Sequence, residues 1–312
     1  LSESLGGSCS PKDLETLMQL VYLSFTAPRM DDTAFESFKT RSKASMLNAE
    51  ANPMTAFNDT LQHEMYGNHP MATRIKADMI DQIDYNRIME MYNDRFKEAG
   101  DFTFLFVGNI NLEEAKPLIE TYLGGLPTIN RKENFQDIKL DRRKGNHKNV
   151  FEKQLETPKA TVISVISGNC EYNLKNNLLM SMLSQTMDMV YTETIREKEG
   201  ASYGVSAFGQ ISRYPKDEAV FQIYFDTDPA KREKMEQIVM AELQKVAKEG
   251  PRPEHLAKVK EYMLKKHLEN VKENSYWVNQ LLEYYFNHID LYTGYEKLVN
   301  EISIKDVKKF AK

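Results

Sequence analysis

The sequence has little of what marks a disulfide-rich secreted domain, a membrane protein or a nucleic-acid binder. Its two cysteines, Cys9 and Cys170, lie far apart and could pair only in an oxidising compartment, so we expect free thiols. No apolar run approaches the roughly 18 residues that span a bilayer. The net charge of -5 leaves no positive excess for nucleic acid or anionic membranes. What remains is an ordinary folded chain of 312 residues, long enough for two domains.

The N-terminus also lacks two features of a complete precursor. The chain begins at Leu1 without a starting methionine, and no apolar signal segment follows. We expect it to be a processed form or an excised fragment of a longer protein, so its beginning does not reveal the compartment.

Helical patterns dominate the first part of the chain. Ser10 before Pro11, with Asp13 behind them, predicts a helix start because it offers a capping hydroxyl and a proline in the first turn. A buried-strand pattern, Phe102 to Val107, ends at Gly108. From the spacing of apolar residues, helices are expected near residues 14–21, 32–47, 53–65, 84–97 and 111–122.

Residues 128–148 are polar and rich in arginine and lysine, which predicts a linker. Almost no aromatic residues are interleaved with the basic ones, so a solvated connector is favoured over a nucleic-acid patch. This linker would separate a helix-rich domain at residues 1–127 from a second domain at residues 149–312.

Strand patterns open the second domain. Apolar runs at residues 150–155 and 160–167 flank Thr157 and Pro158 and predict a hairpin. The order expected after this hairpin is a long helix over 173–198, strands over 202–211 and 219–226, and helices from 229 onward.

The helical stretches of the two domains share a spacing of apolar residues, which indicates an internal duplication. The aligned positions are Phe35, Phe38, Leu47 and Leu61 in the first copy and Leu256, Val259, Leu268 and Leu282 in the second. Opening strands are expected only in the second copy and a closing strand only in the first, so both copies are expected to be incomplete. We therefore predict an α+β fold of two repeated domains, each with a mostly antiparallel sheet packed by helices, the first one truncated.

Four segments carry a resemblance to a known family, and two of them are short motifs: Arg196-Glu-Lys-Glu-Gly-Ala-Ser-Tyr203-Gly-Val and Tyr66-Gly-Asn-His-Pro70. The first is similar to the arginine and tyrosine motif, and the second to the Y-G-x-H-P turn, of the insulinase/pitrilysin-like zinc metallopeptidases, the inverzincins, a family that includes mitochondrial-processing-peptidase-like proteins. The stretches 101–111 and 117–127 resemble the closing strand and helix of the bacterial, PqqL-like branch. The resemblance runs collinearly along nearly the whole chain and implies the C-terminal half of such a protein.

The resemblance implies that Arg196 and Tyr203 face the substrate. A guanidinium offers up to five donors in a fixed fork and a phenol one more, so the pair is suited to a peptide carbonyl or the oxyanion of a tetrahedral intermediate. The structural alternative is an arginine that interacts with the helix dipole at the C-terminal end, and a half-buried aromatic residue in a strand.

The family's zinc motif, H-x-x-E-H on a helix, is absent. The six histidines are His63, His69, His147, His255, His267 and His288. The nearest imitation is His63-Glu64 with His69, but six residues turn a helix by about 600°, so the two rings do not share a face. His69 precedes Pro70 and is expected to make a structural hydrogen bond in the turn. The resemblance implies zinc ligands in a missing N-terminal half, and none in this chain.

Other chemically suggestive residues have a structural reading. Cys9 has no partnered histidine in sequence, so a loop or core residue is favoured over a nucleophile. Helix core is favoured over an adaptable peptide-binding surface for four methionines: Met180, Met182, Met187 and Met189. Core positions are favoured over the lining of a substrate cavity for Tyr284, Tyr285 and Phe286.

Two function classes follow from the resemblance. In the first, the chain is the non-metal-binding half of a zinc endopeptidase, closes a peptide chamber and is inactive alone. In the second, it is a catalytically silent peptide-binding or scaffold subunit. The expected partners are a peptide or small-protein substrate, the N-terminal half of the same protein and, through an uncovered apolar face, further copies of the fragment. A bacterial periplasm or envelope location is favoured only by the branch that the chain resembles.

Overall fold

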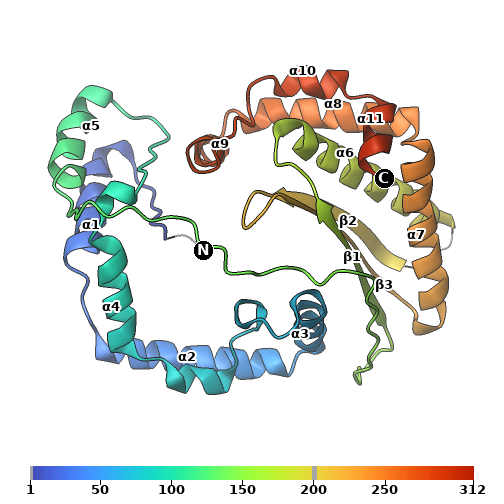
Figure 1. Cartoon of the computed structure of the whole chain (residues 1–312), viewed down its shortest axis with the longest axis horizontal. Coiled ribbons are helices and arrows are strands. Elements are labelled where there is room, and N and C mark those ends of the chain that lie inside the picture. Colours follow the sequence, from blue (N-terminus) through green and yellow to red (C-terminus); the bar gives the residue numbers. More distant parts are fainter. Residues whose placement is uncertain (1–2, 199–201) are drawn as a thin grey trace. The chain divides into compact units, whose positions relative to one another are not determined.

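The computed structural model describes residues 3–198 and 202–312, without the side chains of residues 196–198, 202 and 203 (Figure 1). The chain divides into two compact units, Leu1–Lys153 and Gln154–Lys312. No helix among the described residues combines the length and apolar character needed to cross a membrane.

Unit 1 is built from helices whose starts are fixed locally. Asp31, Asn52, Asp84 and Asn111 each accept a hydrogen bond from a backbone N–H in the first turn of the helix that follows. The helices are α1 (Leu14–Thr26), α2 (Asp32–Glu50), α3 (Pro53–Tyr66), α4 (Tyr85–Phe96) and α5 (Leu112–Leu118), the last continuing as a π-helical segment, η5 (Ile119–Leu123). Short 3-10 turns complete the unit at Pro11–Asp13, Pro70–Ala72, Ala77–Gln82 and Ala99–Asp101.

The predicted strand at residues 102–107 is wrong for the described structure. These residues form no strand, because they find no hydrogen-bonded neighbour strand among the described residues of unit 1. The run packs as side chains instead. Phe102 lies 4.9 Å, ring centroid to ring centroid, from Phe25, which also meets Phe96 at 4.9 Å.

Residues 128–148 contain no helix or strand, and several of them are hydrogen-bonded to unit 1. The Glu98 carboxylate, only 2% exposed, accepts hydrogen bonds from the Thr128 hydroxyl and from the backbone N–H groups of Ile129 and Arg131. Further along, the backbone N–H of Arg143 donates to a carbonyl of α3. The segment therefore has fixed contacts along its length.

Unit 2 is an α+β fold with one three-stranded antiparallel sheet of order β1-β3-β2. The strands are β1 (Ala160–Asn169), β2 (Ser202–Ser212) and β3 (Glu218–Thr227). The predicted strands over 202–211 and 219–226 are confirmed as β2 and β3, which pair with each other, whereas the predicted hairpin of residues 150–155 with 160–167 is wrong. β1 pairs with β3 instead, and residues 150–155 form no strand because exposed side chains such as Val150, 62% exposed, give that run no buried face.

Helix α6 (Leu174–Tyr191) is the central element of unit 2 and continues as a π-helical segment, η6 (Thr192–Lys198). One side of α6 joins a core cluster with the sheet through Met180 and Met187, and the other joins α8 through Met182. The methionine stripe is thus core, as predicted. The remaining helices are α7 (Arg232–Glu249), α8 (Pro253–Asn270), α9 (Asn274–Phe286), α10 (Tyr295–Glu301) and α11 (Ile304–Phe310).

The prediction that Tyr284, Tyr285 and Phe286 belong to the core is wrong, because they are 55%, 53% and 59% exposed. They end α9, a helix without a single buried residue. The aromatic composition of a segment does not by itself show whether other elements of the fold cover its side chains.

Candidate functional site

The candidate site lies where α6 ends and β2 begins. Arg196 is in η6, which ends at Lys198, and Tyr203 is the second residue of β2. Ser202 pairs with Thr227 and Gly204 with Asp226, so the register shifts at Tyr203. The side chains of Arg196 and Tyr203 lie outside the part of the chain that the structure describes, so their role remains a prediction.

A buried histidine fastens η6 to the start of α8. His255 is 2% exposed, and its Nε2 lies 2.9 Å from Oε1 of Glu193 in η6. Arg252 donates to the other oxygen of the same carboxylate. The hydrogen bond from Arg252, reinforced by His255 and opposed by burial, lowers the pKa of Glu193. Two side chains therefore bind the carboxylate of Glu193, three residues before Arg196.

A second polar cluster lies on β3, opposite the first residues of β2. Asp226 is the register partner of Gly204, and its carboxylate accepts a hydrogen bond of 2.6 Å from Thr161 and one of 3.2 Å from Lys159. The Tyr224 hydroxyl also reaches this carboxylate at 3.3 Å. Burial, followed by the charge of Asp226, raises the pKa of Tyr224.

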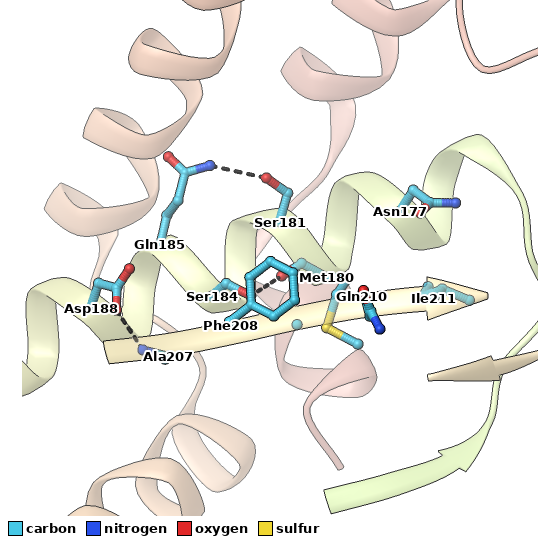
Figure 2. A pocket seen from close by; sticks show the side chains of 11 residues that line it. Asn177, Met180, Ser181, Ser184, Gln185, Asp188, Ala207, Phe208, Gln210 and Ile211 are labelled. Carbon is cyan, nitrogen blue, oxygen red and sulfur yellow. Dashed lines mark hydrogen bonds between the residues drawn. The ribbon is translucent and has the colours of Figure 1, made fainter. Parts of the chain in front are cut away.

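A groove runs between α6 and β2 (Figure 2). Its volume is about 430 Å³. At one end, Oδ1 of Asp188 accepts a hydrogen bond of 2.7 Å from the backbone N–H of Ala207. Burial raises the pKa of Asp188, and the hydrogen bond from Ala207 opposes this. The other helix residues along the groove are uncharged: Asn177, Met180, Ser181, Ser184 and Gln185.

Sequence reasoning did not identify Asp188, Glu193, His255 or Asp226. Asp188 and Ala207 are 19 residues apart, and Glu193 and His255 are 62 apart. No local spacing rule connects such pairs, so only the register of β2 and the packing of α6 on α8 bring them together.

The described histidines have separate structural environments. His69 makes the predicted turn contact, with its Nδ1 accepting from the Met71 N–H at 3.2 Å and its Nε2 lying 3.2 Å from the Ile138 carbonyl. The carboxylate of Glu64 interacts with Arg143 and Asn149 rather than with a histidine ring. Within residues 3–198 and 202–312, no three His, Cys, Asp or Glu side chains form a group that could hold a metal ion.

The two cysteines are free in the structure. Cys9 is exposed, and Cys170 is partly buried beside β1. Burial, with nearby Asp217 and Glu171, raises the pKa of Cys170, so its thiol is less easily ionised than an exposed one.

The comparisons of this chain with known proteins agree on one family. Residues 82–263, which are 182 of the 312 residues, match the peptidase M16 inactive domain. The chain is 25% identical over 298 residues to a protein named zinc protease PQQL-like from Arabidopsis thaliana, covering 89% of this chain and 30% of that protein.

Solved structures share the fold. The periplasmic protease PqqL from Escherichia coli matches with a TM-score of 0.84 at 17% identity, over 96% of this chain and 33% of that one. The first half of the same protease matches with a TM-score of 0.71 at 16% identity, over 97% of this chain and 68% of that structure. The chain thus spans about a third of the length of the proteases that it matches.

Proposed function

From the premise that this chain belongs to the peptidase M16 family, as its inactive, C-terminal domain, we propose that it is the part of a zinc protease that closes the peptide chamber and contacts substrate. The observation that carries the proposal is the family match, together with relatives named as zinc proteases. Proteolysis would belong to the longer protein, and this chain alone is proposed to be inactive.

The residues that the structure describes do not fit a zinc site of the family's type. Family zinc sites use two histidines and a glutamate near one another on a helix, with a further acidic ligand. His63, Glu64 and His69 do not converge on a common point, since their side chains bind other groups or remain separate. We therefore place the zinc and the general base in another part of the same protein, and route no chemical step through this chain's histidines.

Arg196 and Tyr203 are the residues that we propose to contact substrate. The described backbone supports this, because only a short connection separates the end of η6 at Lys198 from the start of β2 at Ser202. Glu193, held by His255 and Arg252, gives η6 a fixed base. Hydrogen-bond donors held on a fixed backbone can stabilise the negative charge that develops on a peptide carbonyl oxygen during nucleophilic attack.

We further propose that the two units are copies of one α+β domain. The step from Asp32 at the start of α2 to Pro53 at the start of α3 is 21 residues, and so is the step from Pro253 of α8 to Asn274 of α9.

The test is peptide hydrolysis by the longer protein that contains this chain. Arg196→Lys and Tyr203→Phe are each expected to lower kcat by about 10²–10³, since each removes or misplaces a donor to the developing oxyanion. The matched control is Arg213→Lys in the β2–β3 turn, where the arginine pairs with Asp217. That control is expected to retain the parent rate.

Two outcomes would contradict the proposal. One is peptidase activity of the 312-residue chain alone at a rate near that of the longer protein. The other is unchanged hydrolysis in both site variants. If the longer protein has no H-x-x-E-H motif and no zinc-dependent activity, the silent peptide-binding or scaffold role replaces the protease role, consistent with the family's description as an inactive domain.

A further inference from the structure

Strand β2 forms an edge of the described sheet. The order β1-β3-β2 leaves one side of β2 without a neighbouring strand among the residues that the structure describes. An edge strand presents backbone N–H and C=O groups that another extended chain is able to pair with.

The hydrogen bond from Ala207 to Asp188 fixes which residues point outward. In an antiparallel ladder a residue directs both its N–H and its C=O either toward the partner strand or away from it, and this alternates along the strand. The N–H of Ala207 goes to Asp188, so Ala207 points away from β3. The register runs without a shift from Ala207↔Ile223 to Ile211↔Ala219, so Gly209 and Ile211 point away as well.

The groove lies beside these outward groups. In Figure 2, α6 runs along β2, with Asp188 next to Ala207 at one end and Asn177 toward Ile211 at the other. Ser181 and Gln185 lie between them and are hydrogen-bonded to each other at 3.0 Å. This side of the groove therefore offers uncharged donors and acceptors.

On the opposite face of β2, one large apolar side chain is open to solvent. Phe208 is 58% exposed and lies between Ser206 and Gln210 on that face, whereas Ala207 and Ile211, which face the core with α6, are 5% and 6% exposed. Side chains on an added strand would alternate in the same way as those of β2, because cross-strand neighbours share a face. Alternate residues of that strand would meet the polar groove, and those between them would meet Phe208.

Asp188 ends this surface with a negative charge. One of its oxygens binds the Ala207 N–H, and no described side chain forms an ion pair with it. Because the carboxyl is half-buried, a cation supplied by a partner would replace lost hydration. A basic side chain is the complementary group at this end of the groove.

We propose that the β2 edge binds an extended peptide by strand addition, with side chains alternating between polar residues toward α6 and apolar residues toward Phe208, and with a basic residue near Asp188. Gly209 and Ile211 supply the outward N–H and C=O groups for the ladder. The inference rests on the proposed peptide-binding role of the chain, and it adds a location and a sequence preference to that role.

The first experiment measures binding of a fluorescein-labelled peptide, Lys followed by Thr or Gln alternating with Val, to the 312-residue chain by fluorescence anisotropy. One set of peptides carries backbone N-methyl groups at every second residue, and the other set carries them at the residues between. One set is expected to bind about tenfold or more weakly than the parent, because methyl groups facing β2 remove ladder hydrogen bonds and obstruct the approach. The other set is expected to bind like the parent.

The second experiment uses variants of the groove. Ser181→Tyr is expected to weaken binding about tenfold by filling the space beside the edge. Its matched control is Ser167→Tyr on β1, an exposed position on a strand that does not border β2, and it is expected to bind like the parent. Asp188→Asn keeps an acceptor for Ala207 and is expected to abolish the preference for Lys over norleucine in the peptide.

Hydrogen exchange of backbone amides in the parent chain tests the proposal without relying on variants, which could lose binding because they misfold. On peptide addition, the amide protons of Gly209 and Ile211 in the parent chain are expected to gain protection from hydrogen exchange, while that of Phe208, which points toward β3, is expected to stay as it was. Equal weakening by both N-methyl sets, no detectable binding, or protection elsewhere would each overturn strand addition.

The outcome is separable from that of the proposed function. Binding at the β2 edge needs neither zinc nor hydrolysis, so it is measurable even if the longer protein proves to have no peptidase activity. Conversely, zinc-dependent proteolysis with an insensitive β2 edge would leave the protease proposal intact and remove only the strand-addition site.

Discussion

Glu98 shows how much structure a single buried carboxylate organises. It accepts hydrogen bonds from the backbone N–H groups of Gly100, Ile129 and Arg131 and from the Thr128 hydroxyl. The bond from Thr128 is the largest cause that lowers the pKa of Glu98, which falls to about 2. These bonds favour the charged form, so the carboxylate fixes the start of the segment 128–148 within unit 1.

The pH dependence of this segment follows from the sign of the shift. The folded pKa of about 2 lies below the unfolded value of 4.5, so the stabilisation is present above pH 4.5 and is lost as the pH falls toward 2. Glu98→Gln is expected to speed hydrogen exchange at residues 129–131 at neutral pH. The difference from the parent should shrink steadily between pH 4.5 and 2.

Mass spectrometry of peptides covering residues 128–133 provides the measurement. The matched control is Glu113→Gln at the exposed first turn of α5, which is expected to leave exchange at 129–131 unchanged. A difference between Glu98→Gln and the parent that stays constant down to pH 2 would contradict this account of the carboxylate.

Among the elements, α6 and β2 are closely packed at Gly209. A Cβ added there would lie 2.1 Å from the sulfur of Met180 and 2.9 Å from the Ser184 hydroxyl oxygen. Met180 is only 4% exposed and belongs to the core cluster, so moving its side chain would disturb core contacts. The glycine is therefore required by close packing of the helix on the strand, and not by a left-handed backbone.

Gly209→Ala is expected to lower the free energy of unfolding by about 1–3 kcal/mol through overpacking. Denaturant unfolding followed by the fluorescence of Trp277, the single tryptophan, reports on unit 2 directly. Met180→Ala alone is expected to cost about 2–5 kcal/mol by leaving a cavity. The double variant should lose less than the sum of the two, because each change relieves the other.

Gly168→Ala is the matched control on the same sheet. A Cβ at that position meets no atom within 4 Å, so the stability is expected to stay near that of the parent. Additive losses at Gly209 and Met180 would show that the two sites do not share the proposed contact.

At the scale of the whole molecule, unit 1 carries large apolar side chains in contact with solvent. Leu20 and Leu23 on α1 are 58% and 50% exposed, and Leu47 on α2 is 54% exposed. Single exposed leucines are ordinary, but several on neighbouring turns of one unit favour association. We propose that further copies of the chain, or the rest of the longer protein, cover them.

Light scattering tests this. The weight-average mass of the 312-residue chain is expected to rise above 36.1 kDa with concentration. The double substitution Leu20→Gln and Leu23→Gln should reduce that rise, whereas Leu268→Gln, at a position 56% exposed in unit 2, should leave it unchanged. A strictly monomeric parent chain at high concentration would contradict the prediction.

Much of the fold was predictable because its signals are local. Asp31, Asn52 and Asn173 start helices with their own side chains, since capping involves only residues two or three positions away. The β2–β3 pair was predictable because a short polar turn joins two apolar runs. The family was recognisable from contiguous motifs, and the family match is consistent with it.

The predictions that were wrong depend on contacts between residues that are far apart in the sequence. The runs at residues 102–107 and 150–155 have the composition of strands, but a strand needs a hydrogen-bonded neighbour, which composition does not supply. Tyr284 and Phe286 look like core residues until the exposed end of α9 is known. Whether a helix face is buried depends on which other elements pack against it. The spacing of apolar residues within that helix does not determine this.

By itself, the sequence determined where most helices begin, that the second unit contains a sheet, and which family the chain resembles. Only the tertiary structure decided that β1 joins β3, that His255 meets Glu193, and that Asp188 caps the outward edge of β2. The physical reason is separation along the chain. Contacts between nearby residues follow from backbone geometry, whereas contacts between distant ones exist only once sheet register and helix packing are fixed.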